Sequence, residues 1–342
     1  MTWINRRFSI CSAALIALGL AAGNATADSA SDFYKDKTVR IVVGYGAGGG
    51  YDAYARMMAP YLAARLGTSV IVENKPGGGG LNALTALVRQ PGDGLRLLLL
   101  NVESAALTQA IGKSGKRYDL RTLTFLARVS YENRTLLGKR GTTYEKFGAF
   151  MNSPKQIIFG AGSREDTLGR PAVLFCYAFH LNCKLITGYK GAAEVALAVE
   201  RGEIDAMVTS ESQSAKLVKS SPLVAVAILS PNKAPLLPAV PTIFELTKPT
   251  AEQKKWIDFN AQLSDLGRSL VVPGDTPADR VAFLKKAVDG ILADPKLIAE
   301  GERLKRPIDY ESGAKNRKTL EDFFKALDPA TTRKVKELLT SR

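Results

Sequence analysis

The segment TVRIVVGYGAGGGYD (residues 38–52) sets the pattern on which the fold is built. Residues 38–43 are mostly valine and isoleucine, which favour an extended strand. A glycine-rich run follows, and from Asp52 to Leu66 apolar residues recur with helical spacing until Gly67, a natural helix stop. The segment therefore predicts a strand, a tight turn and a helix, which together open a β-α-β unit.

The same alternation continues along the chain. Residues 69–73 predict a second strand, residues 82–88 a helix, and the continuous apolar run 95–100 a strand buried on both faces. This order implies a parallel sheet with right-handed crossovers. The pattern then restarts, with strands and helices expected over residues 156–159, 169–180, 184–187, 192–201, 205–208 and 224–228.

The proline-rich segment 231–242 interrupts this second unit and is expected to cross back towards the first. The strand 269–272 and the helix 277–292 would then rejoin the first domain. We expect an α/β protein of two doubly wound domains joined by a hinge, because a chain of this length usually forms more than one core. The expected boundaries are 28–128 for the first part of domain 1, 129–249 for domain 2, and 250–342 for the second part of domain 1 with the C-terminal helices.

The first residues have the features of a secretory signal peptide (residues 1–27). Arg6 and Arg7 precede an apolar stretch over residues 8–22, and a small-x-small pattern ends at Ala27, after which cleavage is expected. The apolar stretch is shorter than the roughly 20 residues that span a bilayer, so a membrane anchor is disfavoured. A periplasmic location follows, by either the general or the twin-arginine export route.

Charge and residue usage narrow the function. The chain has 47 Lys and Arg against 33 Asp and Glu, spread along the sequence, which favours small anions over nucleic acid as the partner. His180 is the only histidine and has no acidic partner nearby, so we expect neither a metal site nor a Ser-His catalytic pair, no cofactor and no enzyme activity. Cys176 and Cys183 could form a disulfide in an oxidising compartment, but their expected places within a helix and just after it favour unpaired thiols.

Two loops are the main candidates for a ligand site, because each joins a strand to a helix. In the loop 44–52, glycines let backbone N–H groups approach an anion at a helix N-terminus. Its partial match to a dinucleotide fingerprint, with Glu73 as the ribose-binding acid, is weak, and Asp52 is expected to cap the helix. A tight turn without a ligand is the other alternative.

In the equivalent loop 160–167, Arg164 could grip a carboxylate or form a surface ion pair with Glu165 or Asp166. Tyr189 could form an aromatic wall, and Asp205 could bind a ligand amine, although a loop-holding role is favoured. The full set of predicted ligand-binding residues is Tyr45, Ala47, Gly48, Gly49, Tyr51, Asp52, Asn101, Ala161, Gly162, Ser163, Arg164, Thr167, Tyr189 and Asp205.

Five segments occur in an order that points to one family. They are VGYGAGGGYDAYAR (43–56), VENKPGGGG (72–80), YKGAAEV (189–195), ERGEID (200–205) and PAVPT (238–242). Together they resemble the tripartite tricarboxylate transporter receptor family, also called TctC or Bug proteins. The resemblance implies a type II periplasmic-binding-protein (Venus-flytrap) fold and capture of a small carboxylate for a membrane partner with a large and a small subunit.

The resemblance also implies how the ligand is held. A ligand carboxylate would be bound largely by backbone groups and ordered water, near Tyr45, Ala47, Gly48, Asp52, Ala161, Gly162 and Ser163. The charged residues 164–166 depart from the family pattern, which has small residues there, so the ligand itself stays open. We expect a monomeric transport receptor; a sensing module for a membrane kinase is the alternative, and a dinucleotide-binding enzyme is disfavoured.

Overall fold

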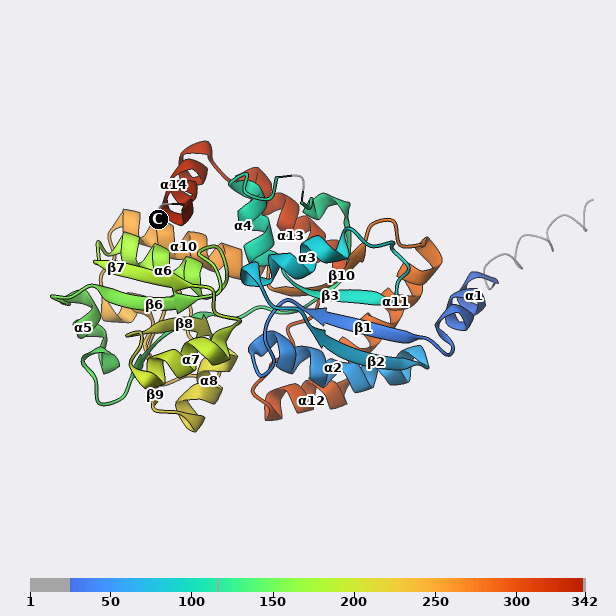
Figure 1. The fold of residues 1–342 in the computed structure, drawn as a ribbon, viewed down its shortest axis with the longest axis horizontal. Coiled ribbons are helices and arrows are strands. Elements are labelled where there is room, and N and C mark those ends of the chain that lie inside the picture. The colour runs from blue at the N-terminus through green and yellow to red at the C-terminus, as the bar shows by residue number, and fades with distance from the viewer. Residues whose placement is uncertain (1–24, 116, 341–342) are drawn as a thin grey trace, which may run out of the picture.

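The computed structural model of the chain describes residues 25–115 and 117–340, which form two α/β domains lying side by side (Figure 1). The expected signal peptide lies outside the described residues except for residues 25–27, which begin helix α1 (Ala25–Tyr34). The expected cleavage site after Ala27 thus falls in the first turn of this helix. Within the described ranges, no helix is both long and apolar enough to cross a bilayer.

Domain 1 is built on a six-stranded sheet with the order β11-β4-β10-β3-β1-β2. β1, β2 and β3 pair in parallel, as the repeated strand-helix pattern predicts, whereas β10 is antiparallel to both neighbours. The strands are β1 (Thr38–Val43), β2 (Ser69–Asn74), β3 (Arg96–Asn101), β4 (Leu123–Ser130), β10 (Arg268–Pro273) and β11 (Glu311–Ser312).

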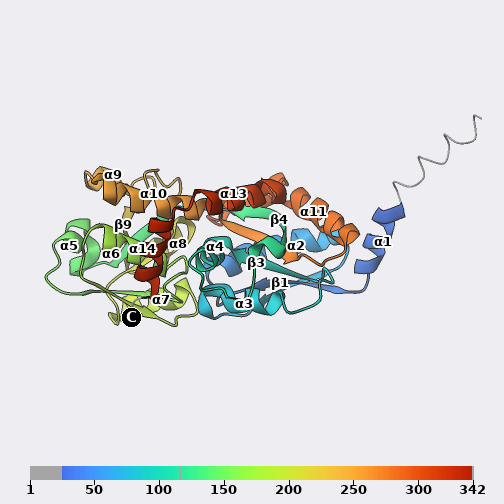
Figure 2. The same cartoon turned by 90° about the horizontal axis from the view of Figure 1, so that it is seen from above.

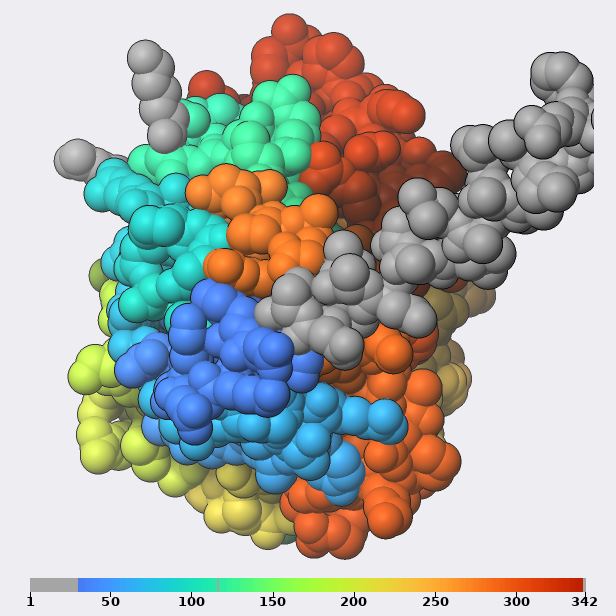
Figure 3. Space-filling model, turned by 90° about the vertical axis from the view of Figure 1, so that its right-hand side faces the viewer, coloured from blue at the N-terminus to red at the C-terminus, as the bar shows by residue number. Residues whose placement is uncertain are grey.

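Helices cover both faces of this sheet, so its central strands are buried and apolar on both sides. One face packs on α2 (Gly50–Leu66), α11 (Ala278–Leu292) and α12 (Pro295–Arg303). The other packs on α3 (Leu81–Leu87), α4 (Val102–Ala110) and α13 (Gly313–Ala326). Helix α1 packs on α11, and the Tyr34 and Phe283 rings stack 5.3 Å apart. In Figure 3 the blue segment at the start of the described residues lies beside the orange segment that contains α11.

Domain 2 contains a three-stranded sheet of order β8-β5-β9 and a parallel pair, β6-β7. A β-bridge between Phe159 and Ala206 joins the two groups. The strands are β5 (Arg134–Lys139), β6 (Ile157–Ala161), β7 (Cys183–Thr187), β8 (Met207–Ser210) and β9 (Leu223–Ile228). The helices are α5 (Phe147–Met151), α6 (Gly169–Ala178), α7 (Ala192–Arg201), α8 (Glu211–Ser220) and α9 (Ile243–Leu246).

Two later helices lie against domain 2, although the sequence places them in the second part of domain 1. Helices α10 (Ala251–Asp265) and α14 (Pro329–Thr340) both pack on α6, and α10 also contacts α4 of domain 1. Seen from above, α9, α10 and α13 lie along one side of both domains (Figure 2). The chain therefore changes domain between β4 and β5, between α10 and β10, and between α13 and α14.

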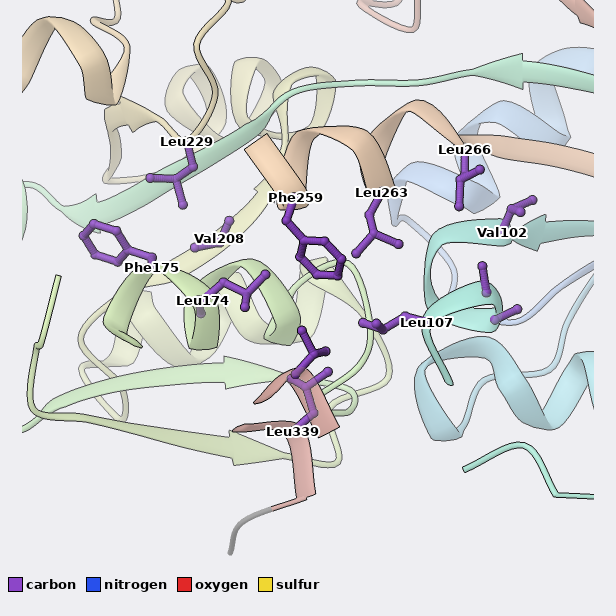
Figure 4. Packing of buried hydrophobic residues seen from close by; sticks show 14 of the residues in the cluster. Val102, Leu107, Leu174, Phe175, Val208, Leu229, Phe259, Leu263, Leu266 and Leu339 are labelled. Atoms are coloured by element: carbon purple, nitrogen blue, oxygen red, sulfur yellow. The ribbon is translucent and has the colours of Figure 1, made fainter. Parts of the chain in front are cut away.

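A continuous apolar cluster joins the domains beneath these crossings. Phe259 and Leu263 of α10 lie between Leu174 of α6 and Leu107 of α4, and all four side chains are buried (Figure 4). The buried side chain of Trp256, also in α10, packs in the same cluster as the residues of α6. Burying apolar surface is the main favourable contribution to packing, so α10 acts as a shared wall between the two cores.

Cys176 and Cys183 form a disulfide, with Cα atoms 6.2 Å apart. The expectation of unpaired thiols is therefore wrong. His180 adopts a left-handed conformation (φ 54°) just after α6, and this reversal brings the first residue of β7 beside the last turns of the helix. The bridge fastens the outer strand of domain 2 to α6.

Candidate ligand-binding cleft

The strand-helix loops of the two domains meet across a closed cleft. The backbone N–H of Gly46, in the loop after β1, donates a hydrogen bond to the carbonyl of Lys190, in the loop after β7 (3.0 Å). Gly79 lies against the loop after β6: a Cβ built on Gly79 would lie 2.6 Å from Oγ of Ser163 and 2.8 Å from Cβ of Asp166. Because Gly79 also has a φ of 64°, glycine is required at this point of contact.

A small cavity of about 30 Å³ lies where these loops converge, with room for roughly two water molecules. Its wall includes the first turns or capping residues of four helices: α2 of domain 1, and α6, α7 and α8 of domain 2. The lining residues are Tyr45, Gly49, Gly50, Tyr51, Arg134, Thr167, Leu168, Ala192, Thr209, Ser210, Gln213 and Arg268. Each helix N-terminus carries about half a positive charge, so this cavity favours an anion.

Two buried arginines add full charges to this wall. Arg134 opens β5 and forms an ion pair with Glu103, and Arg268 opens β10 and forms an ion pair with Glu132. The guanidinium of Arg268 also lies 5.0 Å from the ring centres of Tyr51 and Tyr54. Burial opposes ionisation of Glu132, but Arg268 and a hydrogen bond from Ser212 lower the pKa of this carboxyl, so the pair stays charged.

Tyr45 and Asn101 belong to the scaffold of the cleft. The Tyr45 hydroxyl donates to the carbonyl of Gly79 (2.7 Å) and accepts from Nδ2 of Asn101 (2.5 Å). Asn101 also caps α4, accepting from the backbone N–H of Ser104. Burial raises the pKa of Tyr45, and its ring stacks on Tyr51 at 4.6 Å. Tyr45 therefore joins the two glycine-rich loops of domain 1, and one face of its side chain borders the cavity.

Asp52 does not occupy the cap position expected for it. The N-cap of α2 is Gly49, and Asp52 lies in the first turn, where its carboxylate accepts from the backbone N–H of Gly48 and from Nε of Arg56, both at 2.9 Å. Burial opposes these contacts, but together they lower the pKa of Asp52. The side chain thus braces the turn from inside the helix. Ala47 and Gly48 are exposed at the rim of the cleft.

The second predicted loop is organised by Asp166. Its carboxylate accepts hydrogen bonds from the backbone N–H groups of Gly162, Ser163, Leu168 and Gly169, at 2.7 to 3.1 Å. These include donors that the resemblance assigned to a ligand carboxylate. Thr167 lines the cavity, whereas Ala161, Gly162 and Ser163 are not part of its wall. Burial raises the pKa of Asp166, and the four N–H groups act in the opposite direction.

The remaining predicted residues point elsewhere. Arg164 donates to the carbonyl of Leu338 in α14 (2.9 Å) and does not line the cavity, and Glu165 forms its ion pair with Lys113. Tyr189 packs against Gly160 in the small core beneath α7 and does not line the cavity. Asp205 accepts from the backbone N–H of Ile158 (2.8 Å), which is the loop-holding role favoured from the sequence.

A larger hollow of about 670 Å³ lies on the outside of domain 2, beside the disulfide, and includes Arg164, His180 and Lys184. It is open to solvent and follows α6 towards its C-terminal end, where the helix dipole disfavours an anion. Its wall also comes from one domain and α14 alone, so closure of the domains would not enclose a ligand there. The smaller cavity between the loops is the better candidate.

Arg134, Arg268 and Gln213 are cleft residues that the sequence reasoning missed. The two arginines are each the first residue of a buried antiparallel strand. Because the start of an antiparallel strand lies at the edge where its neighbours end, these positions reach the same sheet edge as the ligand loops. The sequence signal that could have identified them is a charged residue at the first position of an otherwise apolar strand.

The fold and the cleft define a two-domain solute-binding protein, and comparison with known proteins gives the family. The sequence profile of the tripartite tricarboxylate transporter family receptor matches residues 54–299. The chain belongs to this receptor family, whose members include periplasmic binding proteins.

Individual relatives agree with this assignment. Protein BugT of Bordetella pertussis is 26% identical over 254 residues, covering 71% of this chain and 76% of BugT. The structure of the periplasmic binding protein BugD has a TM-score of 0.71 at 22% identity, covering 85% of this chain and 97% of that one. R. palustris Rpa4515 with adipate has a TM-score of 0.73 at 19% identity, covering 90% and 98%. At these identities the two structures show that the fold is shared.

Proposed function

We propose that this receptor binds a small carboxylate in the cleft between its domains and delivers it to the membrane subunits of a tripartite transporter. The observation that carries the proposal is the convergence of the first turns of α2, α6, α7 and α8 on one cavity. Adipate, which is bound in the structure of the similar R. palustris protein, is a dicarboxylate and supports the proposal that the ligand is a small carboxylate. The receptor would act in the periplasm as a monomer, without catalysis.

The closed cavity is smaller than such a ligand, so binding requires the domains to separate and close again. The hinge would lie at the connections between β4 and β5 and between α10 and β10, which are short segments near the ends of elements. Contacts such as Gly46 to Lys190 would form on closure and exclude water from the anion. The closed form is the one that we expect to dock on the membrane subunits.

A thermal-shift screen of the protein without residues 1–27 tests this function. The panel contains mono-, di- and tricarboxylates, neutral sugars and cationic peptides. A carboxylate at 100 times its dissociation constant should stabilise the folded state by about 2.7 kcal/mol. Stabilisation by a sugar or a cationic peptide with no response to any carboxylate would contradict the proposal.

A further inference from the structure

The arginines of the cleft belong to two buried groups in which one glutamate lies between two arginines. Glu103 forms ion pairs with Arg134 and with Arg170, the latter at 2.7 Å. Glu132 forms an ion pair with Arg268 and also interacts electrostatically with Arg306. All six side chains are at most 4% exposed.

These two groups hold more positive than negative charge. Four arginines against two glutamates leave two positive charges in excess. Asp166 and Glu211 are buried nearby; Asp166 also attracts Arg170, but among the described residues neither carboxylate forms an ion pair with Arg134 or Arg268. Electrostatic attraction is stronger in a buried environment than in water, so an anion that reaches Arg134 or Arg268 is favoured.

Only one arginine of each group faces the cavity. Arg134 and Arg268 line it, whereas Arg170 and Arg306 do not. Within the described part of the chain, Nε of Arg134, Nε of Arg268 and the buried hydroxyl of Tyr51, which also lines the cavity, have no hydrogen-bond partner. A Cβ built on Gly50 would lie 3.8 Å from Nη2 of Arg268 and 3.9 Å from Oγ of Ser210, which places this guanidinium at the meeting point of α2 and α8.

The second ligand loop has few donors left for a ligand. Asp166 already accepts from the N–H groups of Gly162 and Ser163, as a ligand carboxylate would. In this chain the Asp166 carboxylate therefore takes the place of an anion bound by this loop. The charged hydrogen-bond donors that remain in the cleft are the guanidinium groups of Arg134 and Arg268.

We propose that Arg134 and Arg268 contact the ligand directly and make the cleft select doubly charged anions over singly charged anions of the same size. This rests on the proposed function, because it assigns the recognition step of the same cleft. The two guanidinium groups that line the cavity match the two carboxylates of a small dicarboxylate, because each planar guanidinium can donate two parallel hydrogen bonds to a carboxylate.

The test compares each dicarboxylate with its own monoamide, which has nearly the same shape and one charge less. Succinate with succinamate and adipate with adipamate are titrated into the protein by calorimetry. We expect the better-bound dicarboxylate to bind roughly 10-fold or more tightly than its monoamide, since a hydrogen bond to a charged group changes affinity by about this factor. In Arg134→Gln this preference should fall close to one.

Arg170→Gln is the matched control. It removes an equally buried arginine from the same Glu103 and leaves one arginine paired with that glutamate, but Arg170 does not line the cavity. Its preference for the dicarboxylate should match that of the unchanged protein. Arg134→Lys keeps the charge, so it should retain part of the preference even if Arg134→Gln folds poorly, which thermal unfolding will show.

The outcomes separate the two proposals. If dicarboxylates bind but the monoamides bind equally well, or if Arg170→Gln loses as much preference as Arg134→Gln, the role of the arginines is refuted while carboxylate capture stands. If neither dicarboxylate binds while another carboxylate of the thermal-shift panel does, the role of the arginines is refuted and carboxylate capture stands. If no carboxylate of that panel binds, carboxylate capture itself is overturned, and the role of the arginines falls with it.

Discussion

Replacing Gly79 by alanine should weaken ligand binding by opposing closure of the domains. Gly79 belongs to domain 1, and the new methyl group would meet Ser163 and Asp166 of domain 2 at 2.6 and 2.8 Å. Such contacts are shorter than van der Waals distances, and overpacking of this kind costs about 1–3 kcal/mol. If the cost falls on the closed form, the apparent dissociation constant rises roughly 5- to 150-fold.

The control separates this effect from backbone strain. Gly67 ends α2 with a φ of 65°, almost the same as the 64° of Gly79, but a Cβ there would meet no atom within 4 Å. Both alanine variants should therefore lose about 1–2 kcal/mol of unfolding free energy from the left-handed conformation. Only Gly79→Ala should also lose affinity in calorimetric titration with a carboxylate found by the thermal-shift screen. Equal affinities of the two variants would refute the link between this contact and closure.

Three further predictions follow from the described contacts. Replacing Cys176 and Cys183 by alanine should lower the unfolding free energy by about 2–3 kcal/mol, measured by denaturant titration, because a loop of this length is no longer closed in the unfolded chain; an unchanged midpoint would contradict it. Burial raises the pKa of Glu211 to about 7, so its contribution to stability is present below its usual pKa of 4.5 and is lost as the pH rises through 7; Glu211→Gln should flatten this part of the stability profile, and an unchanged slope would count against it. Arg164→Ala should change carboxylate affinity less than twofold, because its guanidinium binds the carbonyl of Leu338; a tenfold loss by calorimetry would place Arg164 in the cleft.

The sequence predicted the elements that follow from local patterns. Glycine-rich turns after apolar strands marked the loops at 44–52 and 160–167. Each loop lies at the edge where the parallel strands of its own sheet end, and both loops border the cavity. The repeated pattern and the chain length predicted two α/β domains, and the family resemblance added the type II periplasmic-binding-protein fold, which agrees with the matched profile and the similar structures.

The features that could not be predicted from the sequence depend on contacts between distant segments. The amphipathic pattern of α10 predicts a helix with one apolar face, but it does not say that this face meets α6 instead of the sheet of domain 1. The disulfide depended on the left-handed turn at His180. Asp166 reads as a surface charge until its loop folds around it, and Arg134 reads as the polar end of a strand until Glu103 arrives from α4.

The central claim is that a carboxylate binds where the N-termini of α2, α6, α7 and α8 meet Arg134 and Arg268. A crystal structure of the protein saturated with its best-binding dicarboxylate tests this most directly. The account predicts electron density for the ligand between Gly50 and Ser210, with a carboxylate oxygen within hydrogen-bond distance of at least one of the two guanidinium groups. Ligand density in the outer hollow beside Arg164 and His180, with the cleft holding no ligand, would contradict it.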